Sequence, residues 1–153
     1  MPLPTIATPT FELVLPSNGK KIKYRPFLVK EEKVLILALE TGDTSDITRA
    51  IKDVLKACVQ TRGVKVDQLP TFDIEYLFLN IRARSVGETI KLLVNCPDDN
   101  GETQVSVELD INDIKVQKSE DHTIDIDIDG NYNLRMKYPS LDQFIKNNFD
   151  FKE

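Results

Sequence analysis

The sequence predicts an α+β fold in which three helices from the first half of the chain pack against antiparallel β-hairpins, with a short helix near the C-terminus. Apolar residues recur with helical spacing in three segments before residue 87, and with a period of two in two segments after residue 88. The chain has 153 residues, which suits one domain large enough to bury roughly 70% of its unfolded surface. We therefore expect a single domain over residues 11–153.

The N-terminal segment, residues 1–10, contains three prolines and no regular apolar pattern, so we expect an extended arm. Residues 11–25 predict a first hairpin. A two-residue turn at Asn18-Gly19 would place nearly all apolar side chains of both strands on one face. The cross-strand pairs expected from this turn are Leu15 with Ile22, Leu13 with Tyr24, Val14 with Lys23, and Glu12 with Arg25.

A first helix is predicted over residues 30–41. Its middle is six consecutive apolar residues, Val34 to Leu39, so we expect it to be covered on nearly every side and call it the core helix. Glu31 in the first turn and Gly42 after the last turn favour a helix over a buried strand. The core residues expected from this and the other helices are Val34, Leu35, Leu37, Ala38, Ile51, Leu55, Leu77, Phe78 and Ile81.

A second helix is predicted over residues 46–61, because its apolar residues follow the i, i+3, i+4, i+7 pattern closely. Ser45 is its expected N-cap. A third helix is predicted over residues 71–86, with Gly87 beyond its end. Apolar residues cover most of its circumference, and we expect it to pack beside the core helix.

The second half of the chain predicts two further hairpins. The second hairpin spans residues 88–111, and its two alternating apolar runs are Ile90, Leu92, Val94 and Cys96, then Val105, Val107, Leu109 and Ile111. The third spans residues 122–137, where matching apolar faces requires a three-residue loop. The pairs expected from that loop are Ile128 with Tyr132, Ile126 with Leu134, Ile124 with Met136, and Asp125 with Arg135. An amphipathic helix at residues 140–148 follows.

No metal or cofactor site is expected. The run from Asp125 to Gly130 matches the opening of an EF-hand loop, but Met136 occupies the place of the bidentate glutamate, and the flanks alternate as strands do. Strand alternation explains the same aspartates as a solvated face. A structural zinc site usually has four ligands, and Cys58, Cys96 and His122 are too few and too scattered.

An enzyme is not expected either, because no nucleotide-binding loop, nucleophile elbow or metalloprotease motif occurs. His122 reads as a solvated histidine without a nearby nucleophile. A metal-binding enzyme remains only a distant alternative. The net charge of -5 argues against general affinity for nucleic acid or anionic membrane. No apolar run is long enough to span a membrane and no signal peptide is evident, so a cytosolic protein is expected.

Two regions are candidates for binding a protein partner. Arg82 and Arg84 at the end of the third helix can anchor an acidic surface, or simply complement the helix C-terminus. The two chain ends carry apolar residues beyond what one domain needs, and they either dock onto a partner or cap their own core. These terminal residues are Leu3, Ile6, Phe144, Phe149 and Phe151.

Several landmarks occur in a characteristic order. They are the hairpin with Leu15-Pro16-Ser17 and Asn18-Gly19, then Arg25-Pro26-Phe27-Leu28-Val29-Lys30-Glu31-Glu32-Lys33, Arg82-Ala83-Arg84-Ser85-Val86-Gly87-Glu88, Cys96-Pro97, and Met136-Lys137-Tyr138-Pro139-Ser140-Leu141. Together they resemble the baseplate hub assembly proteins of T4-like tailed bacteriophages.

The resemblance implies a non-enzymatic assembly factor, or chaperone, that works with other baseplate hub proteins or hub assembly factors in the host cytoplasm. A permanent structural component of the virion baseplate is the alternative. The sequence does not separate the two, because both require a soluble domain with a binding surface.

Overall fold

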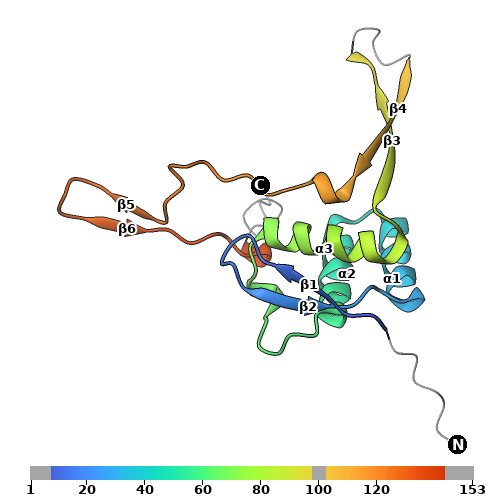
Figure 1. Ribbon diagram of the computed structural model, residues 1–153, viewed down its shortest axis with the longest axis horizontal. Helices are drawn as coiled ribbons and strands as arrows, with labels where there is room; N and C mark the ends of the chain where they lie inside the picture. The colour runs from blue at the N-terminus through green and yellow to red at the C-terminus, as the bar shows by residue number, and fades with distance from the viewer. Residues whose placement is uncertain (1–7, 98–102, 144–153) are drawn as a thin grey trace, which may run out of the picture.

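The computed structural model describes residues 8–97 and 103–143 and confirms the α+β class. The elements in chain order are β1 (Phe11–Val14), β2 (Lys21–Tyr24), α1 (Val29–Thr41), α2 (Thr44–Cys58), η1 (Val66–Gln68), α3 (Thr71–Val86), β3 (Thr89–Asn95), β4 (Gln104–Asp110), η3 (Ile111–Asp113), β5 (Asp125–Asp127) and β6 (Asn133–Arg135). The helices and β1–β2 form a body, from which β3–β4 and β5–β6 extend as two arms in different directions (Figure 1). None of the helices in the described ranges is long and apolar enough to cross a membrane.

The core of the body lies between the inner face of β1–β2 and the helices α2 and α3. Its buried members are Leu13, Leu15, Ile22, Tyr24, Val54, Leu55, Cys58, Val66, Leu69, Ile74, Leu77 and Ile81. Of the core residues expected from the sequence, Leu55, Leu77 and Ile81 are fully buried. Burying one such side chain stabilises the fold by about 1.5–3 kcal/mol.

The expectation that α1 is covered on nearly every side is wrong. Val34 is 45% exposed and Leu37 is 52% exposed, whereas Ala38 is buried and Leu35 packs against the core. The physical reason is position: α1 lies at the border of the body and packs mainly against α2, so only one face is covered. The third helix, α3, packs against α2.

The register of the first hairpin also differs from the expectation by two residues. The observed pairs are Phe11 with Tyr24, Glu12 with Lys23, Leu13 with Ile22, and Val14 with Lys21. The strands are joined by a longer turn, in which the Leu15 N–H donates to the Lys20 carbonyl at 2.9 Å. Because the slip is an even number of residues, the apolar side chains keep the predicted face.

A buried carboxylate explains this longer turn. Asp73 in the first turn of α3 is fully buried, and its Oδ1 accepts a hydrogen bond from the Ser17 N–H at 3.0 Å. The Ser17 hydroxyl donates to Oδ2 of the same carboxylate. This pair fixes the β1–β2 turn against α3. A two-residue turn would instead place Ser17 in the strand ladder.

A second buried carboxylate begins α1. Glu31 is 5% exposed, and its side chain accepts hydrogen bonds from Arg25 at 2.9 Å and from the Leu28 N–H at 2.7 Å. Burial raises the pKa of Glu31, but these hydrogen bonds outweigh it and the net pKa is lowered. The pair therefore joins the end of β2 to the start of α1. At α2 the N-cap is Asp43, whose carboxylate accepts from the Ser45 N–H at 2.7 Å, so the predicted Ser45 cap is wrong.

The apolar runs of the second hairpin pair with each other, and the third hairpin has the register expected from its loop. In β3–β4, Ile90 pairs with Leu109 and Val94 with Val105. In β5–β6, Asp125 pairs with Arg135 and Ile126 with Leu134, which confirms the three-residue loop. A helical turn begins at Leu141, and the rest of the predicted 140–148 helix lies outside the described residues. Among the described residues, the buried core cluster includes strand residues of β1 and β2 and none of β3, β4, β5 or β6.

Candidate functional site: two apolar ladders and the exposed face of α1

One face of the β3–β4 arm is an uncovered apolar ladder. Cross-strand partners in an antiparallel pair project from the same face, so three consecutive apolar pairs line up along the arm. The β3–β4 ladder consists of Ile90, Leu92, Val94, Val105, Val107 and Leu109. All but the half-buried Ile90 are between 37% and 49% exposed. The opposite face carries polar pairs such as Lys91 with Glu108, whose charged atoms are 3.0 Å apart.

The β5–β6 arm also has one uncovered apolar face and one polar face. The Ile128 N–H donates to the Tyr132 carbonyl and the Met136 N–H to the Ile124 carbonyl, both at 2.8 Å, which extends the paired region beyond the named strands. The β5–β6 ladder consists of Ile124, Ile126, Ile128, Tyr132, Leu134 and Met136, which are between 44% and 74% exposed. Its opposite face carries Asp125, Asp127 and Arg135.

Two-stranded hairpins with an uncovered apolar face are marginal structures in water. Soluble monomers rarely expose contiguous apolar patches of this kind unless the patch binds something. The outer surface of α1 also exposes apolar side chains, since Val29 is 80% exposed and Leu39 is 63% exposed. These three surfaces are the candidate binding surfaces of the molecule.

The base of the β5–β6 arm is held against the body by aromatic and polar contacts. Tyr138 stacks on His122 with ring centroids 5.7 Å apart, and its hydroxyl lies 2.6 Å from His122 Nε2. The other side of Tyr138 meets Phe72 of α3 edge to face at 5.0 Å. Lys118 Nζ also donates to the Pro16 carbonyl at 2.6 Å. These contacts orient the arm relative to the β1–β2 turn.

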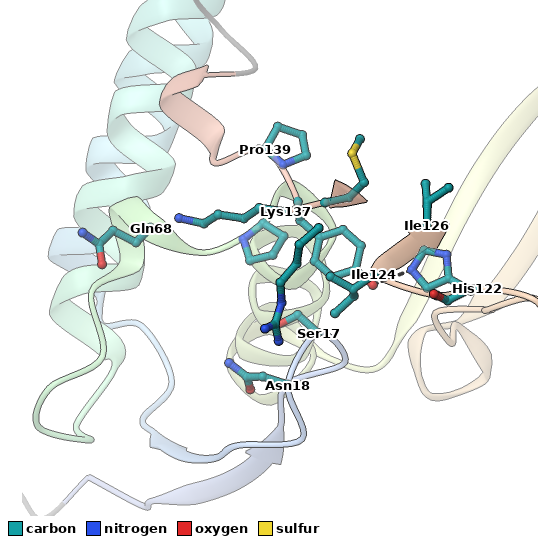
Figure 2. A pocket seen from close by; sticks show the side chains of 13 residues that line it. Ser17, Asn18, Gln68, His122, Ile124, Ile126, Lys137 and Pro139 are labelled. Atoms are coloured by element: carbon teal, nitrogen blue, oxygen red, sulfur yellow. Dashed lines mark hydrogen bonds between the residues drawn. The ribbon is translucent and has the colours of Figure 1, made fainter. Parts of the chain in front are cut away.

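A groove of about 850 Å³ lies between this arm and the body. Figure 2 shows Ile124 and Ile126 of the β5–β6 ladder on one side, with Ser17 and Asn18 of the β1–β2 turn below and Gln68 opposite. The groove is lined by Ser17, Asn18, Gln68, Pro70, His122, Thr123, Ile124, Ile126, Arg135, Met136, Lys137, Tyr138 and Pro139. Its lining combines apolar side chains with polar and charged ones, Arg135 and Lys137 among them.

Of the residues expected to bind a partner, Arg82 and Arg84 are described, and both lie in the last turns of α3 as expected. Arg84 is bound within its own molecule, because it forms an ion pair with Glu88 at 2.7 Å and lies 5.1 Å from the centroid of the Phe11 ring. Arg82 is half-buried on α3, with a buried Nη1 that has no hydrogen-bond partner among the described residues. Leu3, Ile6, Phe144, Phe149 and Phe151 lie outside the described residues.

The titratable groups of the body serve structure. Lys52 lies between Asp67 at 3.1 Å and Asp142 at 2.5 Å, and although burial lowers the pKa of Lys52, the two carboxylates raise it overall. Burial raises the pKa of the Cys58 thiol to about 11. No group of three or more His, Cys, Asp or Glu side chains within residues 8–97 and 103–143 is arranged to hold a metal ion.

Sequence reasoning found the alternation of both ladders and expected the hairpins to pack against the helices. The signal that could have identified them as binding surfaces is the length of the alternating segments. Two further hairpins offer more apolar surface than three helices can cover once the first hairpin has already packed on them. Such an excess indicates a surface that another chain covers.

A family described as "T4 bacteriophage base plate protein" matches residues 8–153. Neither the search of curated proteins nor the search of solved structures gave a significant match. The match covers nearly the whole chain, including all the elements described above. The chain therefore belongs to the T4 bacteriophage base plate protein family.

Proposed function

We propose that this protein is a non-enzymatic assembly factor, or chaperone, for the hub of the phage baseplate. It acts by protein–protein binding in the host cytoplasm, with other baseplate hub proteins or hub assembly factors as its partners. The observation that carries the proposal is the pair of apolar ladders, which have regular registers but leave most of their side chains 37% to 74% exposed. A partner that covers them gains binding energy without a change in the fold of the arms.

The size of this gain is comparable to the cost of association. Each ladder side chain is about half exposed, so covering it contributes roughly 1 kcal/mol on the scale for apolar burial. Two ladders of six such side chains supply about 12 kcal/mol when fully covered, against an association cost of about 4–15 kcal/mol. The exposed face of α1 offers a third surface, which would let one molecule hold two hub components at once.

The shape of the arms also suits a permanent structural component of the baseplate. Both arms are two-stranded ribbons that extend away from the body, as expected for elements inserted between neighbouring subunits (Figure 1). Quantitative mass spectrometry of purified virions separates the two functions. A chaperone should be absent from finished particles and present in lysates of infected cells. A constant number of copies in every virion would contradict the chaperone function and support the structural one.

A further inference from the structure

We propose that the open edge of β6 binds β5 of a second copy of this chain, so that copies associate head to tail through their β5–β6 arms. The inference goes beyond the proposed function, because it assigns the chain a partner in a copy of itself. It follows from the backbone of the arm, the groove at its base and the charges on its polar face.

The register of the arm leaves one side of β6 without a hydrogen-bonding strand. Met136 is hydrogen-bonded to a β5 residue, and Leu134 occupies the same kind of position opposite Ile126. The neighbouring residues, Arg135 and Lys137, therefore direct their N–H and C=O groups away from β5. No third strand joins β5 and β6 among the described residues. An open strand edge of this kind is a template for pairing with another strand.

The groove at the base of the arm extends around this edge. Arg135 lies on the polar face of the arm and Met136 on the ladder face, and both line the groove. From β5, by contrast, the groove meets only residues of the ladder face. Because the groove meets both faces at β6 and one face at β5, it passes along the open side of β6. Lys137 extends across it toward Gln68 of the body (Figure 2), so a strand added to β6 lies between the arm and the body.

The charges around the groove specify the side chains of the incoming strand. The described lining contains Arg135 and Lys137 but no carboxylate. Arg135 is 82% exposed, and Lys137 has no ion pair among the described residues. Cross-strand neighbours share a face, so residues opposite these two cations favour aspartate or glutamate, and a residue opposite Met136 favours an apolar side chain. The incoming strand therefore alternates apolar and acidic residues.

The strand β5 of a second copy has this pattern and an accessible edge. Its aspartates, Asp125 and Asp127, alternate with isoleucines, and all of these side chains are exposed. Both aspartates direct their N–H and C=O groups away from β6, because the isoleucines hold the positions that are hydrogen-bonded to it. At Asp125 these groups are bonded to the Thr123 hydroxyl, a local contact that strand pairing would replace. Since β6 already pairs with β5 in its own arm, a second copy of β5 repeats the same kind of pairing on the other side.

One antiparallel register satisfies both the backbone and the charges. Residues with outward backbone groups must face one another, so Arg135 lies opposite either Asp125 or Asp127 of the second copy. When Arg135 lies opposite Asp127, Lys137 lies opposite Asp125, and the apolar residues between them also face one another. The register shifted by two residues leaves Lys137 opposite Thr123 instead. The first register gives two pairs of opposite charge and is the one we expect.

Charge also selects this contact over the two symmetric ones. Pairing two β6 edges would set the cations Arg135 and Lys137 against each other, and pairing two β5 edges would set aspartates against aspartates. The contact of β6 with β5 joins two-stranded hairpins into a sheet of four strands, which is more stable than an isolated hairpin. It is a heterologous contact that leaves one open edge of each kind, so the assembly grows beyond a dimer. The ladder faces stay uncovered and remain available to the partners of the proposed function.

The test measures the mass of the full chain by sedimentation equilibrium over a range of concentrations. Arg135→Pro blocks the β6 edge and Asp127→Pro blocks the β5 edge, because proline removes an outward N–H that the arm itself does not use. We expect the wild type to exceed the mass of a dimer, and each variant alone to stay at the monomer mass of 17.4 kDa. An equimolar mixture of the two variants restores one complementary contact, so its mass should rise to twice that value and no further.

The matched control is Glu108→Pro on β4, another exposed strand in which apolar and acidic residues alternate. The Glu108 N–H also points outward from its arm, and we expect this variant to associate like the wild type. Loss of association in Glu108→Pro but not in Asp127→Pro would show that β4 occupies the groove and would overturn the proposal.

The remaining outcomes also decide the matter. A dimer of Arg135→Pro alone or of Asp127→Pro alone would contradict the head-to-tail contact, because a symmetric contact needs only one kind of edge. A wild type that stays a monomer at every concentration would refute self-association. Formation of the mixed dimer shows that the arms of both variants stay folded, and far-UV circular dichroism verifies their helices. Failure of self-association leaves the proposed function standing, because detection in virions tests that function independently.

Discussion

Replacing leucine by alanine at two helical positions measures how differently α1 and α3 are buried. Leu77 on α3 is fully buried, whereas Leu37 on α1 is 52% exposed. Leu77→Ala removes a side chain from a closed core and should lower the free energy of unfolding by about 2–5 kcal/mol. Burying a leucine side chain fully contributes about 1.5–3 kcal/mol, and Leu37→Ala loses only about half of this and leaves no cavity. We therefore expect Leu37→Ala to lower the free energy of unfolding by about 1 kcal/mol. Alanine favours helices at least as well as leucine, so propensity does not obscure the comparison.

Urea unfolding followed by circular dichroism at 222 nm measures both values. With a slope of about 2 kcal/mol per molar urea, Leu77→Ala should shift the midpoint by about 1–2.5 M and Leu37→Ala by about 0.5 M. The slope itself should stay constant if both variants unfold in two states. A loss for Leu37→Ala as large as that for Leu77→Ala would refute the exposed position of α1, and with it one of the three binding surfaces.

Three further outcomes are expected. Glu31→Gln should cost about 3 kcal/mol in urea unfolding, because it leaves Arg25 half-buried beside a neutral partner. Because the pKa of Glu31 is lowered in the folded state, its contribution to folding stability is present above about pH 4.5 and is lost as the pH falls through the folded-state pKa. The wild type should therefore lose stability more steeply below about pH 4 than Glu31→Gln. Parallel stability profiles of the two proteins against pH would contradict this. Asp73→Ala should lower the free energy of unfolding by about 2–4 kcal/mol. This loss should exceed that of Ser17→Ala, which keeps the hydrogen bond from the Ser17 N–H to Asp73. A larger loss in Ser17→Ala would show that the carboxylate does not fix the turn. Cys58 should resist a thiol reagent at pH 8 until urea unfolds the chain, because burial raises its pKa to about 11. Cys96 is less buried and should react in the native protein. Rapid labelling of Cys58 in native buffer would contradict its burial.

Sequence alone determined the register of the third hairpin because parity is a local property. In the third hairpin, a two-residue loop would have set isoleucines against polar residues, so the alternation selected the correct loop length and the pair Asp125 with Arg135. The alternation of the first hairpin predicted the correct apolar face but not the correct register. Its turn is fixed by Asp73, which is distant in sequence, so the two-residue shift could not be predicted from the hairpin itself.

The burial of α1 was predicted wrongly for a different reason. Six consecutive apolar residues indicate that a helix must be covered, but they do not indicate which chain covers it. The same holds for the two ladders, whose residues and registers were predictable while their exposure was not. Sequence reasoning instead assigned partner binding to Arg84, which the fold engages with Glu88 and Phe11. The exposure of these apolar surfaces could not be predicted because an apolar pattern carries no information about which chain covers it.

The most direct test of the role of the ladders is the assembly of baseplates in a phage whose own copy of this gene carries one substitution on β3. Leu92 lies on the β3–β4 ladder at 42% exposure, and the adjacent Leu93 lies on the opposite, polar face at 70% exposure. Complete baseplates are counted by electron microscopy of infected-cell lysates. We expect Leu92→Glu to reduce their number by about tenfold or more and Leu93→Glu to leave it near wild type, because only the first change places a charge in the apolar ladder. Equal numbers of complete baseplates in the two variants would contradict the claim that the ladders carry the function of this protein.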